Sequence, residues 1–245
     1  MWFRLSALAI LGALVLAADV CSGLPARPPA RSNFLDDIAS PMSFRLSVKP
    51  GGPAFRITVR SLLRGYSNDP VPAGDIEVAG CSDGRRLQLL IIMAGQPINF
   101  ARTFSASDIN FDGYLDFSVL GEFGAKFGSQ LWWVYEPASG RFVQNELTRE
   151  LGQIKNNGYE IDSEKHAIQI ENVMVGCPPL VTRYRVEDNH LIKVHEEIGK
   201  QIIEASPRQR DLPAGLPCTV TVSDLVAGTM RVTRVRRFVD GEPVK

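Results

Sequence analysis

The sequence lacks an excess of charge of either sign, and it contains only three histidines. Its 27 Lys and Arg residues balance its 27 Asp and Glu residues, so no net positive charge is available to neutralise the phosphates of a nucleic acid. No Cys-x-x-Cys pair occurs among the four cysteines, which argues against a zinc or thioredoxin-type site. The 44% hydrophobic content is typical of globular proteins, and 245 residues suffice for one large or two small domains.

Support for enzymatic chemistry is also lacking. There is no His-Glu-x-x-His zinc helix and no Gly-x-x-x-x-Gly-Lys-Ser/Thr phosphate loop. We interpret His166, His190 and His195 as solvated turn or edge residues. The carboxylate pairs Asp36-Asp37 and Glu196-Glu197 are adjacent in sequence, so their side chains should diverge. We therefore expect a protein that is not an enzyme, with a glycan hydrolase carrying two carboxylates across a cleft as an alternative.

The first 23 residues predict a signal peptide. Arg4 supplies the positive charge, Leu5–Leu16 is an uncharged apolar run, and small residues at 17 and 18 suit cleavage near residue 18. The run is shorter than the roughly 20 residues that a membrane-spanning helix needs. Residues 24–40 are expected to form an extended spacer. These features predict an exported protein of the periplasm, without a transmembrane segment.

The cysteines are expected to form disulfides, which is the default in an exported chain. Cys21, Cys81, Cys177 and Cys218 allow three pairings, and the sequence does not choose among them. Cys81–Cys177 is the pairing that we favour, because both residues end strand-like runs at Gly-Cys before a turn signal. A lipid anchor on Cys21 is the alternative fate of that residue. The preceding Asp19-Val20 departs from the small, uncharged residues of a lipidation site.

Most local patterns are of the strand type, and they predict an all-β fold of short antiparallel strands. We expect strands over 43–48, 54–59, 85–93, 115–120, 130–135, 141–143, 167–175, 180–186, 191–196, 219–222 and 229–238. The apolar run at 85–93 indicates a central strand. One short helix is predicted at Asn145–Leu151, and 197–205 fits either a helical turn or a strand extension. Short strands with turns between them are typical of a sandwich, barrel or propeller.

Two domain-level units are expected. Residues 41–206 form the main β domain, and residues 207–245 form a C-terminal β-appendage or a further part of the same domain. The adjacent Trp132 and Trp133 are expected to pack in neighbouring layers, with an interface anchor as the alternative for the outward ring. The last strand carries four arginines: Arg231, Arg234, Arg236 and Arg237. They indicate a solvated strand edge or, alternatively, a docking patch for an acidic partner.

One segment carries the chemistry of a metal site. Oxygen-bearing side chains occupy positions 1, 3, 5 and 9 of a loop, and Gly113 at position 6 permits a sharp turn. The residues that we expect to bind Ca²⁺ are Asp108, Asn110, Asp112, Tyr114 through its backbone carbonyl, and Asp116. Hard oxygen ligands with three carboxylate charges favour Ca²⁺ over Mg²⁺. An ordinary Asx-rich turn without a metal is the alternative.

This loop departs from an EF-hand. Val119 stands at position 12, where an EF-hand has a bidentate glutamate, and both flanks are strand-like. We therefore expect the loop to join two strands, with Asp116 as a direct ligand.

The stretch from Phe104 to Phe142 resembles the calcium-loop repeats of FG-GAP and VCBS-type propeller proteins. It is most similar to a smaller family of bacterial exported proteins with an Asp-x-Asn-x-Asp-Gly-Tyr-x-Asp loop, an aromatic hairpin and a Gly-Arg-Phe turn. Here the loop is followed by Trp133-Val134-Tyr135 and Ser139-Gly140-Arg141-Phe142. The resemblance implies a β-propeller-like body with a structural Ca²⁺. Some periplasmic members of that family are immunity proteins that inhibit lysozyme-type peptidoglycan hydrolases.

The resulting functional hypothesis is an exported, calcium-binding, non-enzymatic inhibitor of a peptidoglycan hydrolase. Its partner would be that hydrolase, whose active-site cleft it would occlude. An envelope adhesion or scaffold module with the same fold is the alternative from another class.

Overall fold

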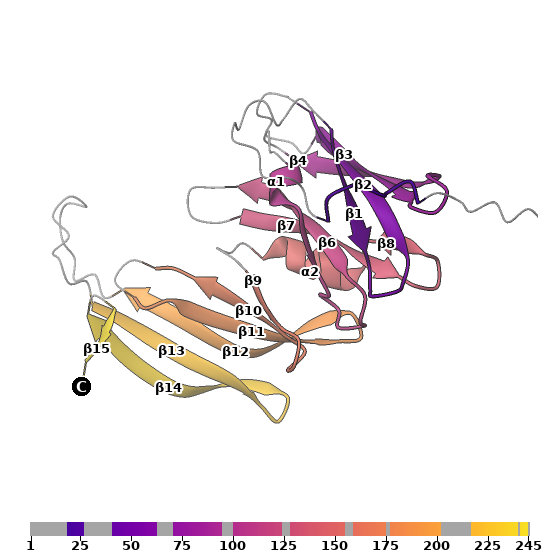
Figure 1. The fold of residues 1–245 in the computed structure, drawn as a ribbon. Coiled ribbons are helices and arrows are strands. Elements are labelled where there is room, and N and C mark those ends of the chain that lie inside the picture. The colour runs from indigo at the N-terminus through magenta and orange to yellow at the C-terminus, as the bar shows by residue number, and fades with distance from the viewer. Residues whose placement is uncertain are drawn as a thin grey trace, which may run out of the picture.

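The computed structural model describes residues 19–26, 41–62, 71–94, 100–123, 128–154, 159–174, 177–201, 217–239 and 241–244. These residues contain fifteen strands and two helices (Figure 1). The strands are β1 (Met42–Ser47), β2 (Ala54–Ser61), β3 (Val71–Gly80), β4 (Arg86–Ala94), β5 (Ser105–Ser107), β6 (Asp116–Phe123), β7 (Gly128–Glu136), β8 (Arg141–Val143), β9 (Tyr159–Asp162), β10 (Ala167–Asn172), β11 (Leu180–Glu187), β12 (His190–Gln201), β13 (Pro217–Val226), β14 (Thr229–Val239) and β15 (Glu242–Pro243). The helices are α1 (Phe100–Thr103) and α2 (Glu146–Gln153).

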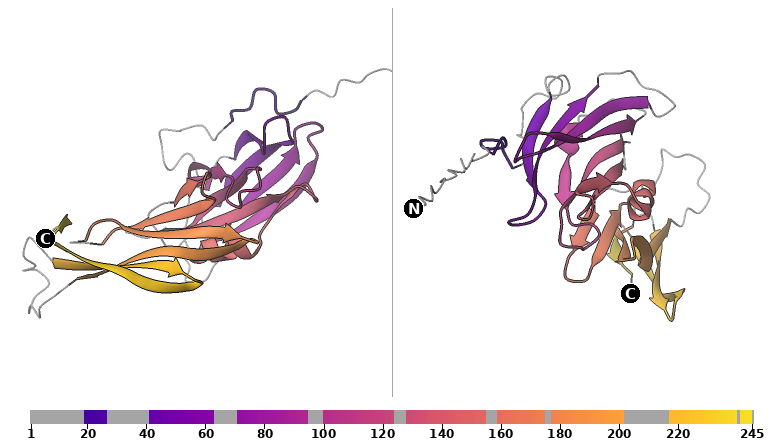
Figure 2. Two further views of the ribbon diagram at one scale, coloured as in Figure 1. Left: turned by 90° about the horizontal axis from the view of Figure 1, so that it is seen from below. Right: turned by 90° about the vertical axis from the view of Figure 1, so that its right-hand side faces the viewer.

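The fold is all-β and propeller-like, as the sequence predicted. Two four-stranded antiparallel sheets follow each other in chain order, β1-β2-β3-β4 and β5-β6-β7-β8, with the strand number of propeller blades. The third sheet has seven strands in the order β15-β14-β13-β12-β11-β10-β9, which is more than the four strands of a propeller blade. Figures 1 and 2 show the first sheet at one end of the molecule and β13 and β14 at the other.

The β1–β2 hairpin forms as predicted, because alternate residues of both strands are buried and Pro50–Pro53 supplies the turn. The predicted central strand at 85–93 is wrong in its position. It forms β4, which pairs with β3 alone among the described strands. Its outward residues Leu89, Ile91 and Met93 are about half exposed. The apolar run shows that the residues of this strand are hydrophobic, but it does not predict whether one strand or two will pair with it.

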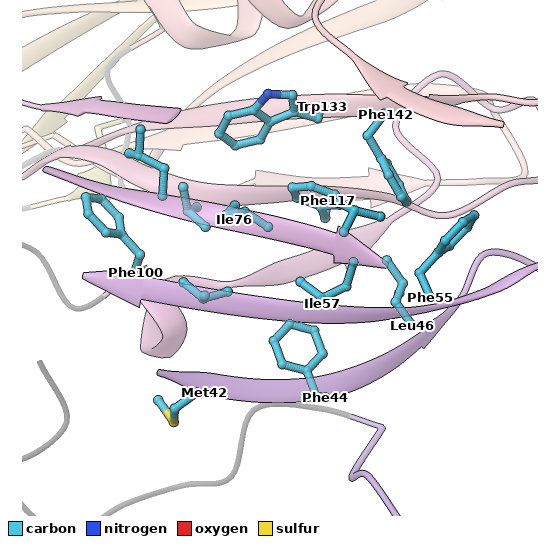
Figure 3. Close-up of a cluster of buried hydrophobic side chains, with 14 of the residues drawn as sticks. Met42, Phe44, Leu46, Phe55, Ile57, Ile76, Phe100, Phe117, Trp133 and Phe142 are labelled. Atoms are coloured by element: carbon cyan, nitrogen blue, oxygen red, sulfur yellow. The ribbon is translucent and has the colours of Figure 1, made fainter. Parts of the chain in front are cut away.

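The first and second sheets share one aromatic core (Figure 3). The ring centroid of Phe117 on β6 lies 4.6 Å from that of Phe142 on β8 and 5.4 Å from that of Trp133 on β7. Gln88 of β4 joins the two sheets, because its side-chain amide donates to the Phe142 carbonyl at 2.9 Å and accepts from the Phe142 N–H at 2.8 Å. This core holds the predicted calcium-loop region against β1–β4.

The two tryptophans are both buried on opposite faces of β7, as expected. Trp133 packs in the aromatic core, whereas Trp132 packs with α2 and β10 in a second cluster. The predicted helix is α2. The Asn145 side chain accepts from the Thr148 N–H, and the Thr148 hydroxyl accepts from the Asn145 N–H, which closes a capping box. Buried Leu147 and Leu151 then fix the helix on β7.

The third sheet includes the described part of the C-terminal segment. β12 continues to Gln201 as a strand, so the region after residue 196 is a strand extension through that point. β13 pairs with β12 from Asp224 opposite His195 to Cys218 opposite Gln201. The described residues 217–239 are therefore hydrogen-bonded into the same sheet as β9–β12, and no separate sheet forms from them.

The disulfides are Cys21–Cys81 and Cys177–Cys218, so the predicted Cys81–Cys177 pairing is wrong. Both cysteines follow a glycine before a turn, but Cys81 lies after β3 in the first sheet, whereas Cys177 lies against Gly199 of the third sheet. The Cys21 sulfur is engaged in its disulfide and is not available for a lipid thioether.

Of the signal peptide predicted over residues 1–23, residues 1–18 lie outside the described residues, as do residues 27–40 of the predicted spacer. Residues 19–23 belong to the fold, which limits the predicted leader to the residues before the expected cleavage near 18, and the whole segment at 19–26 is attached to the first sheet. The Val20 N–H donates to the Cys81 carbonyl, and the Asp19 carboxylate pairs with Arg45 of β1. Within the part of the chain that the structure describes, no helix is long and apolar enough to cross a membrane.

Candidate functional site

The loop 108–116 joins β5 to β6, as predicted. The two strands are antiparallel, and Ser107 lies opposite Asp116 in the register, so the loop is closed at its base. Gly113 has a φ of 85°, and Phe111 has a φ of 60° in the same left-handed region. Glycine adopts this conformation without the steric cost of a β-carbon, so the sharp turn is placed where the sequence predicted it.

The predicted ligand side chains are drawn into this one turn by backbone hydrogen bonds. The two Asp108 oxygens accept from the N–H groups of Asp112 at 3.1 Å and Gly113 at 2.9 Å. The Asn110 amide donates to Asp112 at 3.0 Å, and Asp112 accepts from the Tyr114 N–H at 2.9 Å. Each carboxylate oxygen has a second lone pair, so these bonds leave acceptor capacity for a cation.

Asp116 is the buried member of the set and is fully shielded from solvent. Its two carboxylate oxygens accept from the Ile109 N–H at 2.9 Å and from the Tyr135 N–H at 2.8 Å. Burial raises the pKa of Asp116 to about 7. The two N–H donors act in the opposite direction, and the charges of Asp112 and Asp108 add to the rise. A negative charge at this position is therefore costly unless a cation compensates it.

Tyr114 presents its phenol away from the loop. The hydroxyl accepts from Lys49 Nζ at 2.7 Å, and the same ammonium lies 4.2 Å from the ring centroid. The ring also packs on Tyr135 at 5.4 Å. The phenol oxygen is thus engaged with the β1–β2 turn, and only the backbone carbonyl is left for the role predicted for this residue.

Sequence reasoning missed the contacts that anchor the loop to other sheets. The Leu115 N–H donates to the Val48 carbonyl at 2.7 Å. The Phe111 ring stacks on His166 in the turn before β10, with centroids 5.1 Å apart. The left-handed Phe111 backbone turns its ring outward from the loop, and no local sequence signal predicts which distant residue meets it.

The donor types fit a hard divalent cation, with three carboxylates, an amide oxygen and a backbone carbonyl in nine residues. One oxygen from each of Asp108, Asp112 and Asp116 does not gather within 4.8 Å. Such a cluster does form from Asp19, Cys21 and Cys81, but both of its sulfur atoms belong to the disulfide. The disulfide excludes the cysteine cluster, and 108–116 is the candidate site because of its donor types and its closed turn.

The remaining polar residues singled out from the sequence lie elsewhere. His190 is half exposed at the start of β12, as expected, and contacts Glu150 of α2 at 3.2 Å. For His195 the interpretation as a solvated edge residue is wrong: it lies on β12 between β11 and β13, its side chain is only 18% exposed, and it contacts Asp224 of β13 at 2.7 Å. The Glu196-Glu197 pair diverges as predicted, because Glu196 bonds Lys193 at 2.5 Å and Glu197 bonds Arg236 at 2.6 Å. Asp36 and Asp37 lie outside the described residues.

Residues 80–84 spell Gly-Cys-Ser-Asp-Gly, which has the Gly-x-Ser-x-Gly spacing of a hydrolase nucleophile elbow. The structure places Gly80 at the end of β3 and the other four residues in the turn that leads to β4. The Gly80 N–H donates to the Arg85 carbonyl, and Asp83 accepts from the Arg85 N–H at 3.0 Å. A nucleophile elbow requires a strand followed by a helix, whereas this turn leads from one strand to the next. Ser82 therefore lacks the setting of a catalytic serine.

Comparison with known proteins gives a fold relationship. No protein-family model matches the chain, and no curated protein matches it. A solved structure described as a Xanthomonas type IV secretion system related protein is similar, with a TM-score of 0.51 and 12% sequence identity. The match covers 84% of this chain and 98% of that one. At this identity the likeness shows that the two chains share an all-β fold.

Proposed function

We propose that the protein is an exported, calcium-binding inhibitor of a peptidoglycan hydrolase and that it performs no chemistry itself. The observation that carries the calcium assignment is the 108–116 turn, in which backbone N–H groups orient three carboxylates of one loop. Asp108, Asn110, Asp112, Asp116 and the Tyr114 carbonyl would hold the ion. Calcium would supply positive charge there and cross-link the turn; this role is structural.

The environment of Asp116 supports a cation at this site. A carboxyl whose pKa is raised to about 7 by burial and by two neighbouring carboxylates is stabilised in its charged form when a divalent cation binds. The same carboxylate accepts hydrogen bonds from the N–H groups of Ile109 and Tyr135. Calcium binding would therefore be transmitted to β7 and the aromatic core.

Export is supported by the two disulfides, because such bonds persist in oxidising compartments. The inhibitor role is supported by the resemblance of residues 104–142 to periplasmic immunity proteins. The described relationship of the structural neighbour to type IV secretion is compatible with an envelope role. The mechanism would be occlusion of the hydrolase cleft by a loop or a sheet face.

The test is lysis of purified cell walls by a panel of lysozyme-type hydrolases, with the protein added in calcium and in chelator. The proposal predicts that one or more hydrolases are inhibited at about one protein per enzyme. Asp83→Ala and Ser82→Ala in the β3–β4 turn should leave inhibition intact. Unchanged lysis at a large molar excess across the panel would favour an adhesion or scaffold module. Lysis by the protein alone would show that it is an enzyme.

A further inference from the structure

The strand β14 is exposed on both of its faces. Of its eleven residues only Phe238 is buried, and Val232 and Val235 are 61% and 58% exposed. Its outer neighbour β15 pairs with Phe238 and Val239 alone, and the Val244 N–H reaches the Arg237 carbonyl. Within the described residues, the outer edge from Thr229 to Arg236 therefore has no strand beside it.

The arginines of this edge differ in how they are neutralised. Arg236 bonds Glu197 of β12 at 2.6 Å, across β13. Arg231, Arg234 and Arg237 are exposed and form no direct ion pair with the described residues, although Asp224 of β13 lies opposite Arg231 and its carboxylate interacts electrostatically with Arg234. The protein as a whole has no net charge, whereas three arginines against the single carboxylate of Asp224 leave an excess of positive charge on this strand edge.

An apolar row continues from this edge across the sheet. Val235 lies opposite Thr221 of β13, which lies opposite Ile198 of β12, so the three share one face. Ile198 is 54% exposed. Arg237 and Lys200 lie one row further along on that face, opposite Thr219. The face thus combines exposed apolar side chains with a cationic rim, and Figure 1 shows it on strands remote from β1–β4.

We propose that the edge of β14 binds an extended acidic segment of a partner protein, which adds to the sheet as a further strand. Backbone groups of the exposed edge would pair with the segment, as in other cases of strand addition. On one face of the sheet, carboxylates of the segment would meet Arg231 and Arg234. On the other face, apolar residues of the segment would cover Val232 and Val235, beside Arg237. This surface is independent of the calcium loop and of the hydrolase proposal.

A second copy of the chain is a poorer occupant, because its charges match badly. Antiparallel pairing of two β14 strands along the free edge brings Arg231 and Arg234 of one copy beside the same two arginines of the other. Like charges directly opposite each other destabilise a strand pair. An acidic segment in the same position converts each repulsion into an attraction.

The test uses the purified protein and a fluorescent twelve-residue peptide of alternating Glu and Val. A peptide of alternating Lys and Val is the control with the opposite charge. Fluorescence anisotropy at low salt measures binding, and amide hydrogen exchange locates it. We expect the Glu-Val peptide alone to bind, in a salt-dependent manner, and to slow exchange along residues 229–237. Replacing Arg231, Arg234 and Arg237 together by Ser should weaken binding about tenfold or more.

The matched control replaces Arg85, Arg86 and Arg141, which are also exposed, by Ser and removes the same charge elsewhere. It should bind like the wild type, and V232D/V235D should not bind. Equal losses in both arginine variants, protection outside β14, or no binding of the Glu-Val peptide would overturn the proposal. Binding of phosphatidylglycerol vesicles without peptide binding would assign the surface to a membrane, and β14-dependent dimers would assign it to a second copy.

Discussion

The carboxylate of Asp116 accepts the backbone N–H of Tyr135, nineteen residues further along the chain, at 2.8 Å. Its other oxygen accepts the Ile109 N–H within the 108–116 loop. One buried side chain therefore connects the loop to the aromatic hairpin that follows it. This connection explains how a charge or an ion in an exposed turn can alter the stability of the core.

The first prediction concerns pH in the calcium-free protein. Asp116 has a pKa of about 7 in the folded chain against 3.8 in the unfolded chain, so the folded state holds its proton more tightly. Its contribution to the free energy of unfolding is complete below about pH 4 and is lost as the pH rises through 7. The loss is about 4 kcal/mol at most. Thermal melts in chelator should show it.

Asp116→Asn is the control for this pH effect. The variant keeps one acceptor oxygen but faces one backbone N–H with its amide, which should cost about 1–3 kcal/mol at every pH. Its unfolding free energy should be flatter between pH 4 and 7 than that of the wild type. A wild-type profile that rises over this range, in parallel with the variant, would show that Asp116 is charged in the calcium-free fold.

The second prediction concerns calcium and stability. The wild type should melt at a higher temperature in calcium than in chelator, because calcium binds the folded state selectively. Asp112→Asn keeps an oxygen that can accept from the Tyr114 N–H but removes the negative charge. Asp112→Ala removes the acceptor oxygen as well as the charge. Asp112→Asn should reduce the calcium-dependent rise in Tm, and Asp112→Ala should abolish it. Glu171→Gln, at an exposed position of β10, should keep the full rise.

The third prediction concerns the link between the first two sheets. Gln88→Leu leaves the N–H and the carbonyl of Phe142 without their partner, in a partly buried position. The free energy of unfolding should fall by about 2–4 kcal/mol, measured by urea denaturation. Gln169→Leu, whose amide joins exposed side chains, should cost less than about 1 kcal/mol. Equal costs would show that the Gln88 bridge is not formed in solution.

The fourth prediction concerns the disulfides, whose cysteines are separated by 60 and 41 residues. Loop closure of these lengths stabilises a fold by roughly 4 kcal/mol. C21S/C81S and C177S/C218S should each lose about this amount in urea denaturation. Non-reducing peptide mapping should link Cys21 to Cys81, and recovery of a Cys81–Cys177 peptide would contradict the structure.

Sequence patterns predicted the hairpins and α2 because their signals are local. Alternation, Pro-Gly turns and an Asn cap each act within a few residues. β3 was missed because Pro72 and Gly74 interrupt it. Gly74 is required for packing: a β-carbon there would lie 2.4 Å from the Arg60 carbonyl and 2.8 Å from the Phe100 ring. Glycine usually predicts that a strand is interrupted, but Gly74 lies within β3 at a point where other segments approach its backbone closely.

In the candidate site, too, the local features were predicted from the sequence and the contacts with distant segments were not. The positions of Asp108, Asp112, Gly113 and Asp116 followed from spacing alone, and all lie in one strand-flanked turn. The partners Tyr135 and Lys49 come from other strands and turns, so they depended on the tertiary fold. The disulfide pairing failed for that reason, since local turn signals do not reveal which sheets meet.

Isothermal titration of the chelator-treated protein with Ca²⁺, and separately with Mg²⁺, tests the central claim of a calcium site at 108–116 most directly. The account predicts one Ca²⁺ bound per chain, much weaker Mg²⁺ binding, and loss of the calcium heat in Asp108→Asn/Asp112→Asn but not in Glu171→Gln. No calcium heat in the wild type, accompanied by an unchanged melting temperature, would contradict it. So would binding that persists in the double variant.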